Sequence, residues 1–323
     1  MDTSIMDTNT ETTVNKEEEQ YLNLIKEILD RGTWEDGRNG RTKSIFGHSM
    51  RFSLANGKIP ILTTKKTAWK TCLKELLWFI RGETDNKLLQ DQGVHIWDGN
   101  STRKFLDSRG LTHYDDGELG PIYGYQWRKF NAPYVTKAEQ HIAEQFVGGE
   151  EAYNNHFSKN NKKGVDQLQK IIDALKDPNQ RTSRRLVMTA WNPEQLSEMA
   201  LPPCHILCQF NVHDGNKLSC AMYQRSCDFF LGSCFNIASY SFLTHLLAKH
   251  CGLETHEFIY FMGNVHLYEN AIDAAELQMS RKPFEFPTLS IKQVRENIND
   301  YQVEDFVIEN YQSHDAIKVA MVA

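Results

Sequence analysis

The sequence predicts an α/β fold of the α+β type, with a mixed, largely antiparallel sheet packed with helices. Three observations lead to this prediction. Apolar residues recur with helical spacing in several segments. Short apolar and aromatic runs cluster in the middle of the chain, and two of them flank the turn residues 214–216. Because helices and strands interleave while those two strands form a hairpin, the sheet should be mixed rather than purely parallel.

Five segments are predicted to be helices: 21–34, 67–82, 164–176, 237–251 and about 266–278. In the clearest of them, 67–82, six apolar side chains share one face: Trp69, Cys72, Leu73, Leu76, Leu77 and Ile80. Glu75 lies at the border of that face. Strands are predicted after the Gly- and Arg-rich loop 37–47 and over the segments 184–191, 205–212 and 218–226.

One catalytic domain is predicted over residues 21–323, preceded by a flexible tail of residues 1–20. The tail is polar and acidic, which gives it little apolar surface to bury. Residues 131–163 are polar and weakly periodic, so they are predicted to form a surface insertion. We find no internal repeat.

Composition excludes several classes of protein. Of 323 residues, 40% are hydrophobic and 24% charged, as in globular proteins, and the formal net charge of −6 disfavours general nucleic-acid binding. Seven cysteines are an odd number in a long chain, so a disulfide framework is not expected. The start lacks the pattern of a secretion signal, and no apolar run approaches the roughly 20 residues that span a bilayer. These features favour a reducing compartment, cytosol or nucleus.

The stretch "ALPPCHILCQF", 200–210, contains the first candidate for chemistry. Two prolines restrict the backbone before Cys204, so they can aim its side chain. A thiolate is a strong nucleophile, and nearby cations such as Arg225 would lower the pKa of the thiol. A cysteine that only fills space in the core fits the same pattern equally well.

A metal site in this stretch is the other alternative. Its ligands would be Cys204, His205, Cys208 and His213. On an extended strand, however, Cys204, Cys208 and His213 do not all share a face, and the chain has no paired CxxC motif. No metal is therefore expected.

Several polar groups follow in "QRSCDFFLGSCFN". Arg225 and Ser226 offer a planar cation and a hydroxyl donor, which suits a phosphate group. Asn236 offers a donor and an acceptor that match N3–H and O4 of uracil, although an asparagine here is also a common helix N-cap. The loop "GRNGRT" offers Arg38 or Arg41 to a phosphate, and "HLY" offers His266 and Tyr268 to a sugar hydroxyl.

Taken together, these segments resemble the thymidylate synthase family, from about residue 21 to the end of the chain. "LPPCH" resembles the family's nucleophile motif, and "YQRSCD", "FN" and "SY" resemble its nucleotide-binding stretch. Other matching segments follow in the family's order: "ELLWFIRG", "IWDGN", "GPIYGYQWR", "SRR", "HLY" and the "IK" region near the C-terminus.

The resemblance implies reductive methylation of dUMP to dTMP. The carbon and the hydride both come from 5,10-methylenetetrahydrofolate, which leaves as dihydrofolate. The resemblance also implies an obligate homodimer, in which the sheets of two subunits pack together and Arg184 and Arg185 reach the partner's site. No membrane, metal or specific nucleic-acid partner is implied.

Residue roles follow from the same resemblance. The implied catalytic residues are Cys204, Glu75, Tyr123, Asn236, Arg225 and Asp228. Cys204 would add to C6 of uracil, Glu75 would order water and shuttle a proton, and Tyr123 would help water remove the C5 proton. The residues implied for dUMP are Arg38, Arg184, Arg185, His205, Gln224, Arg225, Ser226, Asn236, His266 and Tyr268. Those implied for folate are Lys65, Trp97, Asp228, Gly232, Phe235 and Ala323.

The chain departs from the family's pattern at several positions. "RNGRT" is shorter than the usual phosphate loop, which leaves both Arg38 and Arg41 as candidates. Other departures are Asn264 for aspartate, Ala271 for histidine, and Ser233 and Cys234 for an apolar residue and proline. Two alternative functions remain open: a related dUMP hydroxymethylase, which adds water instead of hydride, and a nucleotide- or RNA-binding module with a structural cysteine.

Overall fold

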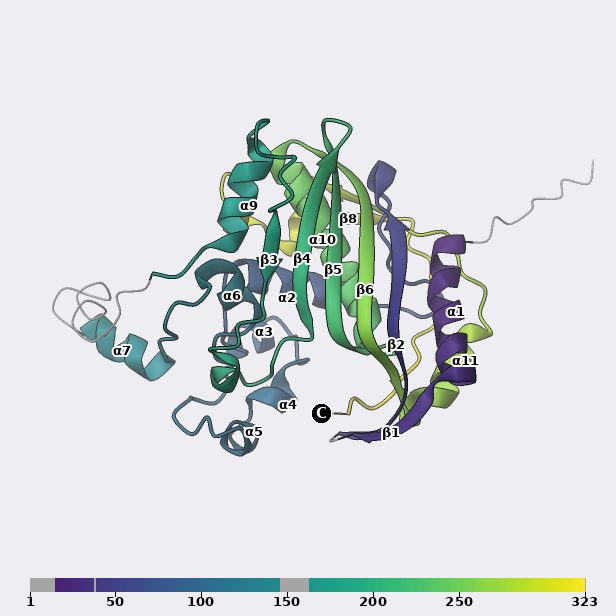
Figure 1. Cartoon of the computed structure of the whole chain (residues 1–323), viewed down its shortest axis with the longest axis horizontal. Helices are drawn as coiled ribbons and strands as arrows, with labels where there is room; N and C mark the ends of the chain where they lie inside the picture. The colour runs from purple at the N-terminus through teal and green to yellow at the C-terminus, as the bar shows by residue number, and fades with distance from the viewer. Residues whose placement is uncertain (1–14, 38, 146–162, 323) are drawn as a thin grey trace, which may run out of the picture.

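A computed structural model of the chain describes residues 15–37, 39–145 and 163–322. Its main sheet has six strands in the order β1-β2-β6-β5-β4-β3. Only β5 and β6 run parallel, which confirms the mixed, largely antiparallel sheet (Figure 1). The strands are β1 (Thr33–Gly37), β2 (Gly40–Ser53), β3 (Val187–Thr189), β4 (His205–His213), β5 (Lys217–Asp228) and β6 (Glu254–Tyr268).

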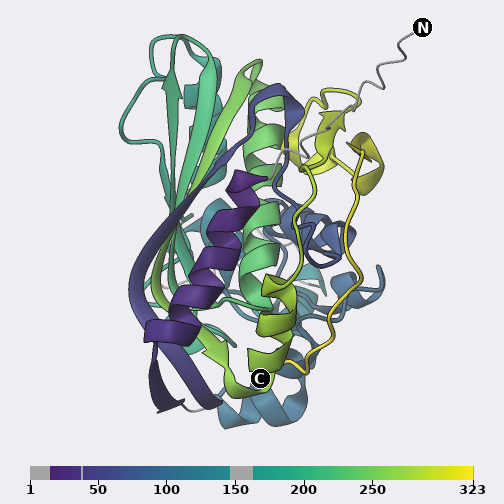
Figure 2. The ribbon, with the colours of Figure 1, turned by 90° about the vertical axis from the view of Figure 1, so that its right-hand side faces the viewer.

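Helices cover one face of this sheet. The long helix α10 (Gly232–Cys251) packs on β5 and β6, α1 (Lys16–Arg31) packs on β2, and α2 (Trp69–Ile80) packs on α10. Seen edge-on, the sheet has these helices on one side and no described helix on the other (Figure 2). The sheet therefore has an open face, whose side chains are not covered within the described chain.

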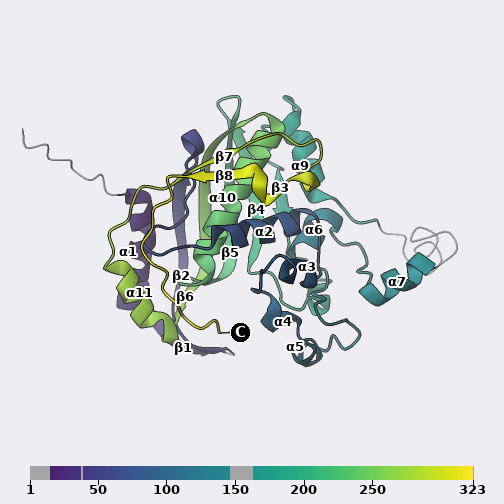
Figure 3. The ribbon, with the colours of Figure 1, turned by 180° about the vertical axis from the view of Figure 1, so that it is seen from behind.

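Shorter elements complete the helical side of the molecule (Figure 3). A two-stranded sheet of β7 (Thr288–Ile291) and β8 (Phe306–Glu309) lies in front of α10 in this view, on the side of the helix away from the main sheet. The remaining α-helices are α3 (Lys87–Gln90), α4 (Asp98–Ser101), α5 (Arg103–Ser108), α6 (Tyr123–Lys129), α7 (Lys137–Gln145), α9 (Gln167–Lys176) and α11 (Ile272–Met279). None of the helices in the described residues is long and apolar enough to span a membrane.

Helix α1 begins earlier than the sequence pattern predicts. It starts at Lys16, inside the predicted tail of residues 1–20, because the side chain of Asn15 accepts hydrogen bonds from the N–H groups of Glu17 and Glu18. Three glutamates in the first turn favour the positive end of the helix dipole. This polar start resembles a tail in the sequence. Residues 1–14 lie outside the described structure.

Strand β6 is missing from the predicted elements. It lies between β2 and β5 and is paired along both edges. The predicted helix at 266–278 was wrong at its start, since the strand continues to Tyr268 and α11 begins only at Ile272. Residues 258–262 of β6 are apolar on both faces of the sheet, including the exposed Phe261, so the run lacks the alternation that marks a half-exposed strand and local periodicity does not identify it.

The predicted surface insertion, 131–163, contains helix α7, and residues 146–162 lie outside the described structure. The predicted strand 184–191 is only three residues long as β3. By contrast, the predicted helix 67–82 is confirmed as α2, and its apolar face is buried against α10.

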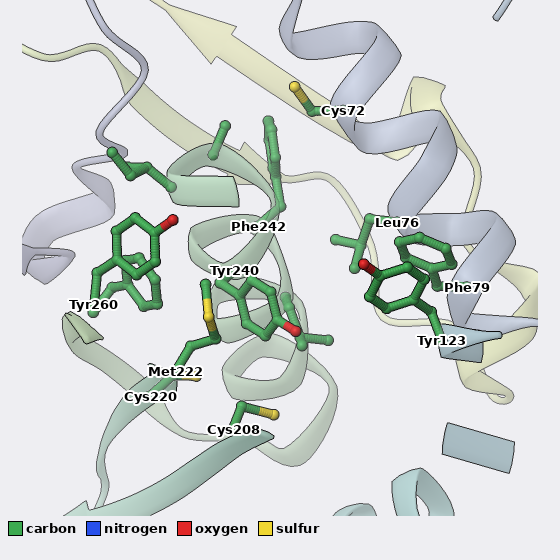
Figure 4. Close-up of a cluster of buried hydrophobic side chains, with 14 of the residues drawn as sticks. Cys72, Leu76, Phe79, Tyr123, Cys208, Cys220, Met222, Tyr240, Phe242 and Tyr260 are labelled. Atoms are coloured by element: carbon green, nitrogen blue, oxygen red, sulfur yellow. The ribbon is translucent and has the colours of Figure 1, made fainter. Parts of the chain in front are cut away.

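The core lies between the sheet and α10. Strands β4 and β5 contribute Cys208, Cys220 and Met222, which surround Tyr240 of α10 (Figure 4). On the other side of Tyr240 lie Tyr123 and the side chains of α2. This packing connects the start of β4 to α2 and α6, and so brings residues far apart in sequence to one end of the sheet.

Candidate active site

Cys204 lies directly before β4, in a turn that Arg225 holds from the neighbouring strand. Arg225 Nε donates a hydrogen bond to the carbonyl of Pro203 at 2.8 Å, and Nη2 donates to the carbonyl of Pro202 at 3.1 Å. The backbone N–H of Arg225 donates to the carbonyl of Cys204 at 2.9 Å. One guanidinium thus fixes the two proline carbonyls and stands beside the thiol, so the turn is rigid for two reasons, proline geometry and these bonds.

Tyr123 fixes the same turn from the opposite side. Its hydroxyl accepts a hydrogen bond from the N–H of Cys204 at 2.8 Å. The ring stacks on His205 with a centroid distance of 4.2 Å, and His205 Nδ1 lies 2.8 Å from the hydroxyl of Tyr240. Burial lowers the pKa of His205 to about 3. His205 is therefore neutral at physiological pH and acts by position and hydrogen bonding, not by charge.

The thiol of Cys204 is mostly buried, and burial raises its pKa. The positive charge of Arg225 and a hydrogen bond with Tyr123 oppose this effect, while the carboxyl group of Asp228 adds to it. The neighbouring cation expected from the sequence is present, but in the chain by itself burial has the larger effect. The thiol is then protonated at neutral pH until something brings further positive charge or removes the proton.

Glu75 of α2 is the group most suited to proton exchange. Burial raises its pKa to about 7, and a hydrogen bond from the indole N–H of Trp97, at 2.8 Å, acts in the opposite direction. The Trp97 ring lies edge-on to Tyr123 at 6.0 Å, so Glu75 and the Cys204 turn belong to one buried cluster. A carboxyl group that titrates near neutral pH can both donate and accept a proton.

Asp228 lies at the end of β5 and organises the start of α10. Its Oδ1 accepts hydrogen bonds from the N–H groups of Phe230, at 3.2 Å, and Leu231, at 3.1 Å. Burial raises the pKa of Asp228, and Lys65 and His266 are among the groups that oppose the shift. The buried ammonium of Lys65 bonds to the Phe230 carbonyl and lies 3.7 Å above the Phe230 ring. These contacts place Lys65, Asp228 and the first residues of α10 together.

Asn236 is not a helix N-cap. Helix α10 begins at Gly232, so Asn236 lies inside it, and the cap position belongs to Leu231. Its half-exposed amide makes no hydrogen bond within the described part of the chain, which leaves both amide groups available for a ligand. A Cβ built at Gly232 would lie 3.9 Å from the Asn236 side chain, so these two residues face the same space. Phe235, beside them, is partly buried against the core.

Gln224 and Ser226 lie on β5 between the Cys204 turn and Asp228. The Gln224 side chain accepts a hydrogen bond from the hydroxyl of Tyr260 at 2.6 Å and donates one to the Ser226 carbonyl at 2.9 Å. Gln224 is therefore held in one orientation. His266 of β6 is the register partner of Asp228, and its ring meets the edge of Tyr268 at 5.3 Å.

The predicted phosphate-binding arginines are not brought together in the described structure. Arg184 and Arg185 lie in the exposed turn before β3, not on the predicted strand, because β3 begins only at Val187. Arg41 pairs with Glu269 at 3.3 Å and stacks over Trp34 at 4.7 Å. Arg38 lies outside the described residues, as does Ala323 at the chain's end.

No set of three or more histidine, cysteine, aspartate or glutamate side chains in the described residues is arranged to hold a metal ion. Among the four residues considered for a metal site, Cys208 lies in the core and His205 bonds to Tyr240. The metal alternative therefore has no geometric support in this part of the chain.

Two further residues contribute to the site and are not among the residues predicted from the sequence. Tyr240 orients His205, and the ring of Trp191 lies 5.3 Å from the guanidinium of Arg225. The segment "SY" includes Tyr240 and is part of the resemblance to the family, so it is the signal in the sequence for this residue. Trp191 had none, because nothing local to "TAWNP" indicates that β5 will pass beside it.

Comparison with known proteins identifies the family of the chain. The profile of the family described as thymidylate synthase matches residues 19–323. A bifunctional dihydrofolate reductase-thymidylate synthase of Leishmania major is 47% identical over 310 residues, covering 95% of this chain and 55% of that protein. The thymidylate synthase of Equine herpesvirus 2 is 46% identical over 305 residues, covering 94% of this chain and 98% of that protein.

The chain therefore belongs to the thymidylate synthase family. It spans about half the length of the bifunctional relatives from Leishmania major and Plasmodium berghei. A probable thymidylate synthase of Schizosaccharomyces pombe is also matched over 48% of its length, at 46% identity.

Proposed function

We propose that the chain catalyses the reductive methylation of dUMP to dTMP, with 5,10-methylenetetrahydrofolate as the donor of carbon and hydride. Membership of the thymidylate synthase family supports this proposal. The observation that carries it is the Cys204 turn, since Arg225 and Tyr123 hold one thiol at the mouth of a buried polar cluster. A cysteine that only packs would not need both restraints.

In the proposed reaction, the thiolate of Cys204 adds to C6 of uracil, and the electron pair of the C5=C6 bond moves toward O4. C5 then bonds to the methylene carbon of the folate. Loss of the C5 proton, expulsion of tetrahydrofolate, hydride transfer from it to the methylene carbon and departure of the thiolate give dTMP and dihydrofolate. The carbon and all three hydrogen atoms of the new methyl group thus come from the folate.

The residues of the site supply hydrogen bonds and proton exchange for these steps. The free amide of Asn236 fits N3–H and O4 of uracil, where negative charge develops. Glu75, with a pKa near 7, exchanges a proton with water near O4, and Tyr123 orients water near C5. Lys65, Trp97, Asp228, Gly232 and Phe235 line the side where folate would lie.

We further propose that the open face of the sheet packs against a second copy of the chain. Three exposed side chains lie next to one another across this face: Leu207 of β4 pairs with Tyr223 of β5, which pairs with Phe261 of β6. They are 36%, 36% and 43% exposed, an arrangement that is unfavourable in water. The exposed Arg184 and Arg185 would then complete the partner's phosphate site.

Mixing two inactive variants tests the exchange of arginines between subunits. A Cys204→Ala chain lacks the nucleophile, and an Arg184→Ala, Arg185→Ala chain lacks the donated cations. If the arginines act across the interface, co-refolding both chains should restore about a quarter of wild-type activity, because half the dimers then hold one complete site. No recovery would place the arginines in their own subunit's site. The interface itself is tested by sedimentation. Leu207→Asp should lower the fraction of the protein that sediments as a dimer, whereas the control Leu277→Asp, an exposed position on α11, should not.

Turnover is tested by following the rise in dihydrofolate absorbance with dUMP and methylenetetrahydrofolate. Mass spectrometry with 5-fluoro-dUMP and the folate should detect an adduct on Cys204 that is absent in Cys204→Ala. Hydroxymethylated nucleotide without dihydrofolate would instead indicate the hydroxymethylase, and binding without an adduct would indicate a nucleotide-binding module.

All seven cysteines are free thiols, which supports our proposal of a reducing compartment, cytosol or nucleus.

A further inference from the structure

His266 lies in a buried polar position at the end of β6. In the register of the sheet it faces Asp228 of β5 on one side and Ser44 of β2 on the other. Its side chain is 8% exposed, and Tyr268 meets its ring edge-on. An imidazole in such a position is defined by which of its two nitrogen atoms carries the hydrogen.

Asn264 makes a direct contact with one of these two nitrogen atoms. Its Oδ1 lies 2.8 Å from His266 Nδ1, two residues further along the same strand. An amide oxygen only accepts hydrogen bonds, so Nδ1 carries a hydrogen in this contact; when the ring is neutral, Nε2 therefore keeps its lone pair. Nε2 is then an acceptor, available to a hydroxyl group that donates.

We propose that Asn264 is a positioning residue that holds His266 as the neutral Nδ1–H tautomer, so that Nε2 accepts a hydrogen bond from the sugar hydroxyl of the nucleotide. An aspartate at position 264 would bond to the same Nδ1–H. Its negative charge, however, would favour the imidazolium form, in which Nε2–H donates instead of accepting. The side chain at position 264 thus determines whether Nε2 of His266 accepts or donates a hydrogen bond. The identity of the ligand rests on the proposed function, whereas the tautomer does not.

The charges around His266 agree with a neutral ring. Burial lowers its pKa from the usual value, while the carboxyl group of Asp228 and a hydrogen bond to the backbone of Asn264 oppose that effect. Burial raises the pKa of Asp228, while Lys65 is among the groups that oppose this shift. Ser44, the neighbour on β2, and Tyr268, on β6, are uncharged at neutral pH. A carboxylate at position 264 would add a second negative charge in direct contact with the ring.

Nitrogen-15 spectra of the histidines in the full-length protein test the inference without any substrate. We expect wild-type His266, assigned by its loss in His266→Gln, to show a protonated Nδ1 and an unprotonated Nε2 at pH 7.5. Asn264→Asp should raise the titration midpoint of His266 by about one pH unit. Asn179→Asp adds the same charge at an exposed turn and should leave that midpoint unchanged.

Kinetics connect the tautomer to the nucleotide. The ratio of the KM for dUMP in Asn264→Asp to that in the wild type should change through the raised midpoint of His266, because the titration of Glu75 is common to both proteins and cancels in the ratio. An Nε2–H tautomer in the wild-type protein, or an unchanged midpoint in Asn264→Asp, would overturn the inference. A protein that shows the expected spectra but does not turn over dUMP would contradict the proposed function and leave the tautomer in place.

Discussion

Cys204 and Cys208 lie four residues apart and have opposite surroundings. Burial raises the pKa of the Cys204 thiol, but Arg225 and Tyr123 act against it. At Cys208, a hydrogen bond that its thiol donates to Cys220 and burial both raise the pKa, and no neighbouring cation opposes them. Cys208 also lies in the close-packed core, 1% exposed, beside Tyr240 (Figure 4).

The contrast between these two cysteines indicates what makes a thiol available for chemistry. Burial separates the two cysteines only in part, because Cys204 is partly exposed and Cys208 is fully buried, yet burial raises the pKa of both thiols. The separating features are a cation, a polar partner for the backbone and a position before the strand instead of within it. The following predictions test that comparison.

Replacing the two cysteines should give opposite results, and this is the largest expected effect. Cys204→Ser should reduce kcat at least about a thousandfold, because a serine hydroxyl is a far weaker nucleophile than a thiolate. Cys208→Ala should keep kcat within about twofold, since its sulfur touches only core residues. Steady-state turnover of dUMP measures both. A normal rate in Cys204→Ser would end the assignment of the nucleophile.

Removing the cation should make Cys204 behave more like Cys208. Arg225→Met should raise the pKa of the Cys204 thiol and lower kcat/KM by about a hundredfold, because it removes a charge and two hydrogen bonds to the proline carbonyls. The rate of iodoacetamide alkylation against pH measures the thiol directly. Arg225→Lys is the matched control, which keeps the charge but loses the paired bonds. It should restore most of the alkylation rate and little of the turnover.

Glu75 should make the free energy of unfolding of the protein depend on pH, which the neutral core side chains around Cys208 should not. Its folded pKa of about 7 lies above the value near 4.5 of an unfolded glutamate, so the folded state binds the extra proton between these values. The stabilisation from protonated Glu75 is full below pH 4.5 and is lost as pH rises to about 7. We expect the wild-type free energy of unfolding, relative to Glu75→Gln, to fall over that window and to be constant above it. Urea unfolding at several pH values measures this difference, and a flat difference would contradict the assignment.

The smallest effect concerns the core cysteines. Cys220→Ala should lower the free energy of unfolding by about 1–2 kcal/mol, through lost packing around Met222 and Tyr240. Turnover per folded molecule should remain near the wild-type value. Cys220→Ser would bury a hydroxyl group in the same place and should cost more stability than alanine if its hydroxyl finds no good partner. Thermal and urea unfolding separate the two variants, and a large loss of turnover in Cys220→Ala would show that the core and the site are not independent.

Elements whose pattern is local are predictable from the amino-acid sequence. The apolar face of α2 and the hairpin of β4 and β5 follow from side-chain spacing and turn residues, and the structure contains them. The turn formed by Pro202, Pro203 and Cys204 and the mixed character of the sheet are also predictable from the sequence. The family resemblance, carried by motifs in order, is confirmed by the profile match.

Features that depend on residues distant in sequence are not predictable in this way, because they are set by contacts formed in the folded chain. The place of β6 between β2 and β5 depends on pairing along both edges, and the early start of α1 depends on one capping side chain. The protonation states of Cys204, Glu75 and His266 depend on burial set against a few neighbouring charges and hydrogen bonds. Spacing along a chain identifies which groups are present. It does not give the dielectric surroundings or the distance to a partner on another strand, and these set the charge of each group.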